Sequence, residues 1–417
     1  MDETAVPGRA CRVRKRLPLR TGLLLRGVLL STFAISAAKF VLPGATMQGG
    51  YLTIEDGKFA GWTAEKPACE VVEYPGAIVG PGLVDTHIHG FHNHATTDCD
   101  PAAIDDASVA LAKSGTTTWL PTTFTESVED IGRACAAIAQ ADEARSEDYA
   151  GAHIGGIFLE GPFFTTAHVG AQNPKFLIDP TVEVFDGWQE QAGGRIVKSA
   201  LAAEKDGALE YIAALDARGV VTAIGHSDAT YDEALAAVNA GASCFVHTYN
   251  GQRGLHHRDP GVTGCAMTTP ETYAEIICDG KHVVPAAIKA LVDAKGWQHT
   301  VLITDCLICG GMPEGEYVSG GMPVVMKGGL CYVKAEDGST GTIAGSVLTL
   351  AKGVKNMVDW QIVTAEQAIR MATEVAARSA KIDHVCGSIK PGRAADLTIF
   401  NADMTLAATY VSGALAE

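Results

Sequence analysis

Residues 77–90 read AIVGPGLVDTHIHG, an apolar stretch that ends in two histidines. We predict a β-strand over Ala77–Asp85, because apolar runs of this length alternate with alanine-rich helical patterns from about residue 80 onward. Such alternation is typical of repeated βα units around a parallel sheet. Seven further strands are predicted at Thr116–Phe124, His153–Leu159, Arg195–Ala202, Gly219–Ile224, Ala242–His247, Thr272–Cys278 and Thr300–Thr304. Eight parallel strands close a (β/α)8 TIM barrel, so the predicted fold class is α/β.

The stretches between these strands contain helical patterns at the spacing that a barrel needs. We predict helices at Pro101–Ser114, Val128–Ala144, Gly207–Arg218 and Tyr231–Ala240. A last helical zone, Ser346–Lys381, is expected to complete the outer ring of helices. The segment Gly251–Met267 has neither pattern and is predicted to be a long loop at the barrel mouth.

Two β-rich segments rich in glycine flank the barrel domain, which we place at residues 80–382. Residues 22–79 and 383–417 are each too small to bury a core, so we expect one small β-sandwich domain built from both. Residues 1–21 are predicted to be a disordered basic tail, followed by a strand over Leu23–Ser31. The apolar run after the tail resembles a secretory signal. Arg26 interrupts it, which leaves too short a stretch to span a bilayer.

The composition of the chain is that of a globular enzyme. It has 417 residues, of which 47% are hydrophobic and 19% are charged. Asp and Glu number 48 against 32 Lys and Arg, and the resulting charge of -16 argues against nucleic acids and anionic membranes as partners. An anionic substrate would therefore need a local basic site. The 11 cysteines form no disulfide framework and no pair of CxxC motifs, which favours reduced thiols and a cytoplasmic location.

Polar residues capable of binding a metal gather at the carboxyl ends of the predicted strands, where barrel enzymes hold their active sites. They are His87, His89, Glu160, His226, His247 and Asp305. A single histidine is more often a hydrogen-bonded core or surface residue, but four at strand ends beside a glutamate favour a divalent metal site, for zinc or iron. Asp305 could cap the loop after its strand. We favour a role in which it takes a proton from water and passes it to the leaving group.

Several longer motifs contain these residues, and with them the chain resembles the amidohydrolase superfamily. The His-x-His pair and the aspartate of the eighth strand are common to that superfamily. Narrower motifs resemble the N-acetylglucosamine-6-phosphate deacetylases from about Leu24 to the C-terminus. These motifs are Leu159-Glu160-Gly161-Pro162, Arg258-Asp259-Pro260-Gly261 and Asp279-Gly280-Lys281-His282.

The resemblance implies hydrolysis of N-acetyl-D-glucosamine 6-phosphate to D-glucosamine 6-phosphate and acetate, with water activated by a divalent metal. It implies that Glu160, His226 and His247 hold the principal ion and that Asp305 is the acid-base residue. It also implies a substrate site, in which the sugar and its phosphate are held by Asn250, the Gly251 backbone, Arg258 and His282. In the family this arginine crosses a two-fold interface, so a homodimer is expected.

Two positions depart from the pattern of many family members. His87 and His89 are both present where members with one metal often lack them, so a second ion bridged through Glu160 is an alternative to a single ion. Zinc is the preferred ion, with iron or another divalent ion as alternatives. Gln172 stands where some members carry a histidine that contacts the acetyl carbonyl. Glutamine can donate a hydrogen bond to that carbonyl but cannot carry a proton.

Three other functions remain open at this point. The substrate could be the galactosamine epimer, since the orientation of one hydroxyl depends on loop geometry. The enzyme could be another amidohydrolase of the dihydroorotase, hydantoinase or deaminase type, many of which use a carboxylated lysine on strand 4. Lys198 is the lysine on that strand, but it lies mid-strand. A catalytically inactive homologue acting as a scaffold or sensor would have lost ligands or the base, and each of them is present.

Overall fold

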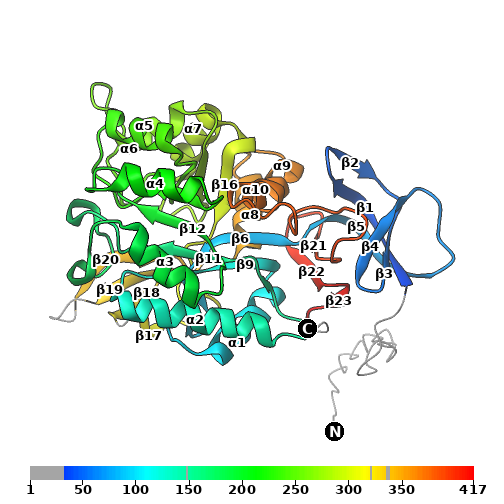
Figure 1. The fold of residues 1–417 in the computed structure, drawn as a ribbon. Helices are drawn as coiled ribbons and strands as arrows, with labels where there is room; N and C mark the ends of the chain where they lie inside the picture. The colour runs from blue at the N-terminus through cyan, green and yellow to red at the C-terminus, as the bar shows by residue number, and fades with distance from the viewer. Residues whose placement is uncertain (1–31, 147–148, 320–321, 335–338) are drawn as a thin grey trace, which may run out of the picture.

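The computed structural model describes residues 32–146, 149–319, 322–334 and 339–417, and Figure 1 shows their arrangement. The predicted basic tail and the predicted strand Leu23–Ser31 lie outside these residues. None of the helices in the described part of the chain is long and apolar enough to cross a membrane.

Eight parallel strands form the barrel and confirm the predicted α/β fold class. In spatial order they are β6 (Leu83–Ile88), β9 (Thr116–Thr123), β11 (Ile157–Glu160), β12 (Ile196–Leu201), β13 (Val221–Ile224), β14 (Cys244–Phe245), β15 (Tyr273–Ile277) and β16 (Thr300–Ile303). Almost every residue of these strands is buried, as expected for a parallel sheet covered on both faces. The backbone joins the first strand to the last through hydrogen bonds from His89 N to Cys306 O and from Asp305 N to His87 O, both 2.9 Å long.

The predicted first strand, Ala77–Asp85, was wrong in its limits. Its first half belongs to β5 (Glu70–Pro81) of another sheet, and the barrel strand begins only at Leu83. The chain passes between the two sheets at Gly82, where an added Cβ would lie 1.9 Å from Thr117 Oγ1. The predicted strand His153–Leu159 is also divided, into β10 (His153–Ile154) and β11.

Helices surround the barrel (Figure 1). The predicted helices correspond to α1 (Pro101–Lys113), α2 (Val128–Ala144), α4 (Ala208–Asp216) and α5 (Tyr231–Ala240), and the last helical zone to α8 (Leu350–Asp359), α9 (Ala365–Met371) and α10 (Glu374–Ser379). Helices that the sequence pattern did not reveal are α3 (Val182–Gln191), α6 (Gly261–Thr268) and α7 (Pro285–Lys295). Short 3-10 turns lie at Thr166–His168, Pro174–Phe176 and Trp297–His299.

Helix α6 corrects the prediction of one long loop over Gly251–Met267. The loop ends at Pro260, and the following residues form a helix. Six of the eight residues of α6 are buried, so it has no extended polar face to produce an amphipathic pattern. Packing against the barrel therefore explains this helix better than local sequence does.

The first and last strands of the described chain lie in one sheet beside the barrel (Figure 1). Its strands are β1 (Thr32–Leu42), β2 (Ala45–Gln48), β3 (Tyr51–Glu55), β4 (Lys58–Thr63), β5, β21 (Leu397–Phe400), β22 (Leu406–Val411) and β23 (Ala414–Leu415). Strands β21 and β5 pair antiparallel, with Thr398 opposite Gly80, and the sheet has its own buried cluster around Phe40 and Ile399. This agrees with the expected small terminal domain. Its limits at residues 79 and 383 stay predictions.

A second small sheet lies between β16 and α8 and was not predicted. It is antiparallel and consists of β17 (Gly315–Ser319), β18 (Met322–Lys327), β19 (Leu330–Lys334) and β20 (Thr340–Gly345). A further two-stranded ribbon, β7 (Gly90–Phe91) and β8 (His94–Ala95), follows the first barrel strand. Both insertions follow barrel strands at their carboxyl ends, so they build up the face of the barrel on which the predicted ligands lie.

Candidate metal and active site

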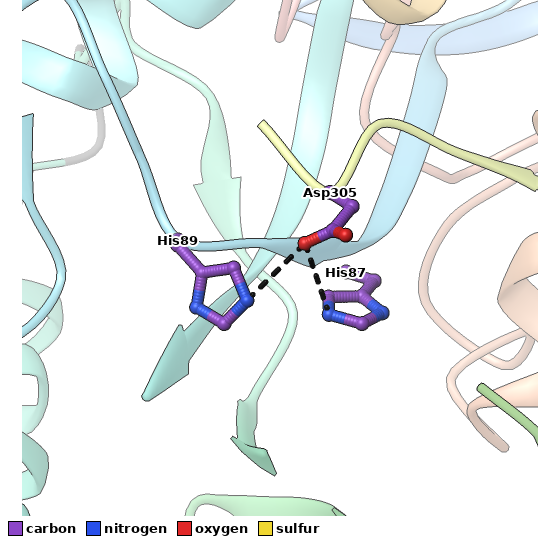
Figure 2. A group of neighbouring side chains, drawn as sticks. All are labelled: His87, His89 and Asp305. Carbon is purple, nitrogen blue, oxygen red and sulfur yellow. Dashed lines mark ion pairs between the residues drawn. The ribbon is translucent and has the colours of Figure 1, made fainter. Parts of the chain in front are cut away.

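The six predicted ligand residues come together at the carboxyl end of the barrel, and all are buried. Their ligand atoms form two groups, each within 4.8 Å: one of His87, His89 and Asp305, and one of Glu160, His226 and His247. Figure 2 shows the first group, in which the Asp305 carboxylate, on the chain just after β16, faces both rings. The Asp305 Oδ1 atom lies 3.5 Å from His87 Nε2 and 3.3 Å from His89 Nε2.

The carboxylate of Glu160 connects the two groups. Its Oε1 atom lies 3.1 Å from the Nε2 atoms of both His87 and His247, and 3.5 Å from His226 Nε2. Its Oε2 atom lies 3.1 Å from His89 Nε2. Each oxygen therefore faces one or more imidazoles, so Glu160 is in contact with both groups of potential ligands.

The ligand histidines are oriented by contacts on the far side of each ring. The Nδ1 atoms of His226, His247 and His89 donate to the backbone oxygens of His168, Asn250 and Thr122, at 2.8, 3.1 and 3.2 Å. A carbonyl oxygen can only accept, so these rings carry the hydrogen on Nδ1 and turn the Nε2 lone pair toward the site.

The histidine donors fit a divalent ion. His87 makes the equivalent contact to a carboxylate, with Nδ1 3.0 Å from Glu275 Oε2. Its Nε2 atom is buried and makes no well-aligned hydrogen bond, although Glu160 Oε1 lies 3.1 Å away. Neutral imidazole nitrogens beside carboxylate oxygens are the usual ligands of zinc and related ions.

The backbone is strained where three of these residues turn out of their strands. His226, His247 and Asp305 have φ angles of 47°, 26° and 49°, in the left-handed region that side chains other than glycine seldom adopt. Such conformations cost free energy and are concentrated at functional sites. Gly251 packs against this turn, since a Cβ there would lie 3.0 Å from His226 Nδ1.

The histidines and carboxylates of the cluster shift the pKa values of one another, and each favours the charged form of its neighbours. Burial would raise the pKa of Asp305, but His87 and His89 together hold it below its ordinary value. Burial likewise opposes ionisation of Glu160, and His87 and the neighbouring imidazoles hold its pKa well below the usual range. Burial lowers the pKa of His87, but Glu160, Asp305 and Glu275 outweigh it and raise the pKa to about 10. The carboxylates therefore stay ionised, and a bound cation would take the place of the proton on His87.

A cavity of about 290 Å³ opens above the cluster. It is lined by His89, Phe124, Glu160, Gly170, Ala171, Gln172, His226, His247, Asn250, Gly251, His282, Asp305 and Thr342–Gly345. Residues 342–345 belong to strand β20 of the inserted sheet, which brings them to the cavity wall. Among the predicted substrate residues, the cavity brings together Gln172, Asn250, Gly251 and His282.

Arg258 is the predicted substrate residue that does not reach this cavity. It is exposed on the loop before α6, and its Nη1 atom lies 2.8 Å from His257 Nε2. Within the described residues of this chain, Arg258 therefore has no contact with the cavity in which phosphate binding was predicted.

Two of the lining residues are held by specific hydrogen bonds. The Gln172 amide nitrogen donates to Glu160 Oε2 at 2.6 Å, and its oxygen accepts from Thr125 N at 2.8 Å. His282 Nδ1 lies 2.6 Å from Asp279 Oδ2, and its Nε2 atom is buried without a partner. His282 can thus offer a positioned nitrogen to a polar ligand in the cavity.

Sequence reasoning missed Glu275. This residue lies in the middle of β15 among apolar neighbours, and it is fully buried behind His87. A charged residue inside an apolar run was the available signal. Lys198 is buried mid-strand, as predicted, and forms an ion pair with Glu275 and not with the ligand cluster. This contact argues against a carboxylated lysine as the bridging ligand.

The chain is similar to a family model and to curated proteins that are all amidohydrolases or amino sugar phosphate deacetylases. The Amidohydrolase family model matches residues 78–416. The chain is 41% identical over 335 residues to the N-acetylglucosamine-6-phosphate deacetylase of Vibrio furnissii, which covers 80% of this chain and 82% of that protein. It is 34% identical over 386 residues to the N-acetylgalactosamine-6-phosphate deacetylase of Escherichia coli O157:H7, with 93% and 100% covered.

A solved structure is similar over almost the whole chain. It is a mutant N-acetyl-D-glucosamine-6-phosphate deacetylase from Mycobacterium smegmatis in complex with N-acetyl-D-glucosamine-6-phosphate. The TM-score is 0.86 at 28% sequence identity, and the match covers 93% of this chain and 99% of the other.

Proposed function

The chain belongs to the amidohydrolase family, and from this premise we propose that it hydrolyses N-acetyl-D-glucosamine 6-phosphate to D-glucosamine 6-phosphate and acetate. One observation carries the proposal: Glu160 connects two groups of potential metal ligands, and Asp305 lies beside them in the same cavity. The similarity to deacetylases of N-acetylated amino sugar phosphates supports the choice of substrate.

We propose one or two divalent ions as the cofactor, with zinc as the first candidate and iron as an alternative. Glu160, His226 and His247 would hold the principal ion, and His87, His89 and Asp305 would offer the second position. When bound, such an ion supplies Lewis acidity, which activates water and polarises the amide carbonyl.

Asp305 is the proposed carrier of the proton. Its carboxylate is ionised in the cavity, and it can take a proton from the attacking water. As the C–N bond breaks, the same proton passes to the amine nitrogen, and the water oxygen remains on acetate. The strained backbone at Asp305, where the carboxylate faces the ligand cluster, supports this role because such strain is concentrated at functional sites.

The remaining lining residues are proposed to hold the sugar. The Gln172 amide group carries two hydrogens, so it can donate to Glu160 and still donate to the acetyl carbonyl. Asn250, the Gly251 backbone and the free Nε2 atom of His282 supply further polar contacts in the cavity. These contacts suit the hydroxyl and phosphate groups of the substrate.

We propose a homodimer in which Arg258 of each subunit binds the phosphate held by its partner. The exposure of Arg258 outside its own cavity supports this arrangement. Its guanidinium can form charge-assisted bidentate bonds with a phosphate. An anionic ligand needs such a local positive charge because the net charge of the chain is -16. Leu255 lies on the same loop with 56% of its surface exposed, and it would be covered at an interface.

A cytoplasmic location remains our proposal for the compartment. The 10 cysteines in the described residues are free thiols, and most of them are buried. This thiol state is typical of proteins kept in a reducing environment.

The experiment that tests the function is acetate release from four substrates: the gluco and galacto epimers, each with and without the 6-phosphate. We expect the phosphorylated gluco epimer to give the largest kcat/KM and the unphosphorylated sugars to react poorly. The similarity to a galactosamine-phosphate deacetylase makes the galacto epimer the second candidate. Equal rates with and without the phosphate would contradict the proposed substrate class.

A further inference from the structure

Glu275 is a fully buried carboxylate that lies behind the ligand cluster, in contact with His87. It lies mid-strand in β15, between Ala274 and Ile276, and has no solvent-exposed surface. One oxygen forms an ion pair with Lys198 of β12, while the other lies 3.0 Å from His87 Nδ1 of β6 and accepts from the His247 backbone N–H at 3.3 Å. Glu275 is not among the residues that line the cavity, so it does not touch a substrate held there.

A buried ion pair of this kind contributes little net stability. Removing two charged groups from water costs as much as their attraction returns, and an apolar pair of similar volume is often as stable or more so. Stability therefore does not account for Lys198 and Glu275. The second contact of Glu275, to the His87 ring in the ligand cluster, indicates that the pair serves to orient that ring.

His87 differs from the other three ligand histidines in its orienting partner. The others donate from Nδ1 to neutral backbone oxygens, whereas His87 donates to a carboxylate. A carboxylate behind a ligand imidazole fixes its orientation and makes its other nitrogen a stronger donor to a metal. The ring of Phe158 completes the support: its centroid lies 4.9 Å from that of His87 and 4.0 Å from Lys198 Nζ.

We propose that Glu275, held in place by Lys198, is the positioning residue that makes His87 a metal ligand, so that the second ion depends on it. The inference rests on the proposed metal dependence and deepens it. It predicts that loss of the Glu275 acceptor weakens the ion at His87, His89 and Asp305, whereas the ion at Glu160, His226 and His247 is retained. Acetate release is measured separately, so that failure of this inference is distinguishable from failure of the proposed function.

Two double variants test the proposal without leaving an unpaired buried charge. Lys198→Met with Glu275→Gln keeps an oxygen that can accept from His87 Nδ1, whereas Lys198→Met with Glu275→Leu removes it. The matched control is the exposed ion pair of Lys334 and Glu316, whose atoms lie 2.8 Å apart, replaced as Lys334→Met with Glu316→Gln. Each metal-free protein is titrated with Zn²⁺ by calorimetry, and bound zinc is counted by elemental analysis.

The wild type and the control are expected to bind two zinc equivalents. The leucine variant should bind its second equivalent about 10- to 100-fold more weakly, the usual effect of losing an orienting partner, and its first equivalent normally. The glutamine variant should lie between them. Thermal unfolding of each metal-free protein reports whether the fold is intact, and we expect no loss of cooperativity.

A third variant covers the case in which the leucine variant does not fold. Glu275→Asp keeps the charge beside Lys198 but shortens the side chain, which withdraws its oxygen from His87. It should also weaken the second zinc. The proposal is overturned if the aspartate or leucine variant binds two equivalents with wild-type affinity, if both equivalents weaken together, or if the wild type binds only one. Acetate release by a wild type with one ion would still uphold the proposed function.

Discussion

The Asp85 carboxylate accepts a 2.6 Å hydrogen bond from the Thr304 hydroxyl and so connects the first and last strands of the barrel. Both residues are buried, and each lies next to the cluster: Asp85 two positions before His87, and Thr304 directly before Asp305. Backbone N–H groups of His87 and Thr304 also donate to Asp85 Oδ1, at 3.3 Å each. The position of Asp305 relative to His87 therefore depends on this side-chain contact as well as on the sheet.

Thr304→Val should lower the free energy of unfolding by about 1–3 kcal/mol, because it leaves a buried carboxylate without its strongest partner. Activity should fall further than stability explains, since Asp305 follows directly. Denaturant unfolding and acetate release, the latter measured where the variant is fully folded, check the two parts. Thr405→Val, at an exposed position, is the control. An unfolding free energy equal to that of the wild type would show that the contact is dispensable.

Glu160→Gln, His226→Gln and His247→Gln should each lower bound metal and activity together, because each removes a ligand of the principal ion. His87→Gln should affect a second ion alone. Elemental analysis of the purified variants, combined with acetate release, measures both effects. Full metal content in the Glu160→Gln enzyme would refute the assignment of Glu160 as a ligand.

Asp305→Asn should keep the fold and the principal ion at Glu160, His226 and His247 but slow turnover by at least about a hundredfold, the lower scale for loss of a positioned general base. Asparagine has the same shape but cannot accept the proton. Turnover at saturating substrate, with metal content determined on the same sample, is the measurement. Near-normal turnover would remove Asp305 from the mechanism.

Arg258→Ala should weaken substrate binding by roughly 1.5–3 kcal/mol, the scale of a hydrogen bond to a charged group. The position of the residue is tested by mixing Arg258→Ala with Asp305→Asn, both nearly inactive. A two-fold dimer of the two variants contains one site with both residues and one with neither. Random mixing after refolding should therefore restore about a quarter of wild-type sites.

Subunit exchange in that mixture is confirmed by mass. If exchange occurs but activity stays at the average of the parents, Arg258 does not act across the interface. The exposed position of the Arg258 loop would then need an explanation other than the proposed homodimer.

Lys295 gives a pH dependence of stability that is independent of the metal site. Burial lowers the pKa of this lysine to about 8, while its ammonium group donates to Thr272 Oγ1 at 2.6 Å. The folded state thus binds fewer protons than the unfolded state between pH of about 8 and the ordinary value of 10.5. The contribution of Lys295 to stability should therefore rise with pH across that window.

The measurement compares denaturant unfolding of wild type and Lys295→Met at several pH values. The stability of the wild type relative to this variant should increase from pH 8 to pH 10.5. Lys289→Met, in the same helix but exposed and paired with Asp293, is the control. A constant difference for Lys295→Met would contradict the shifted pKa.

The sequence predicted much of the site because barrel geometry makes strand ends converge. His87, His89, Glu160, His226 and Asp305 each follow or end an apolar run, and parallel strands in a barrel bring such positions to one face. The same reasoning anticipated the small domain from both chain ends, since neither end could bury a core alone. Composition and motif were sufficient for these conclusions because they depend on local pattern and on one general rule of topology.

Other features became visible only in the tertiary structure. Glu275 reaches His87 across 188 positions of sequence, and no local pattern reports a contact between residues so far apart. Helix α6 has no extended polar face, Gly82 is required by the approach of Thr117, and strand β20 reaches the cavity through a sheet that the barrel rule does not predict. Local sequence thus determined which residues end strands. Long-range packing decided which of their buried neighbours support the site, because the free energy of these contacts arises only when distant strands are brought together.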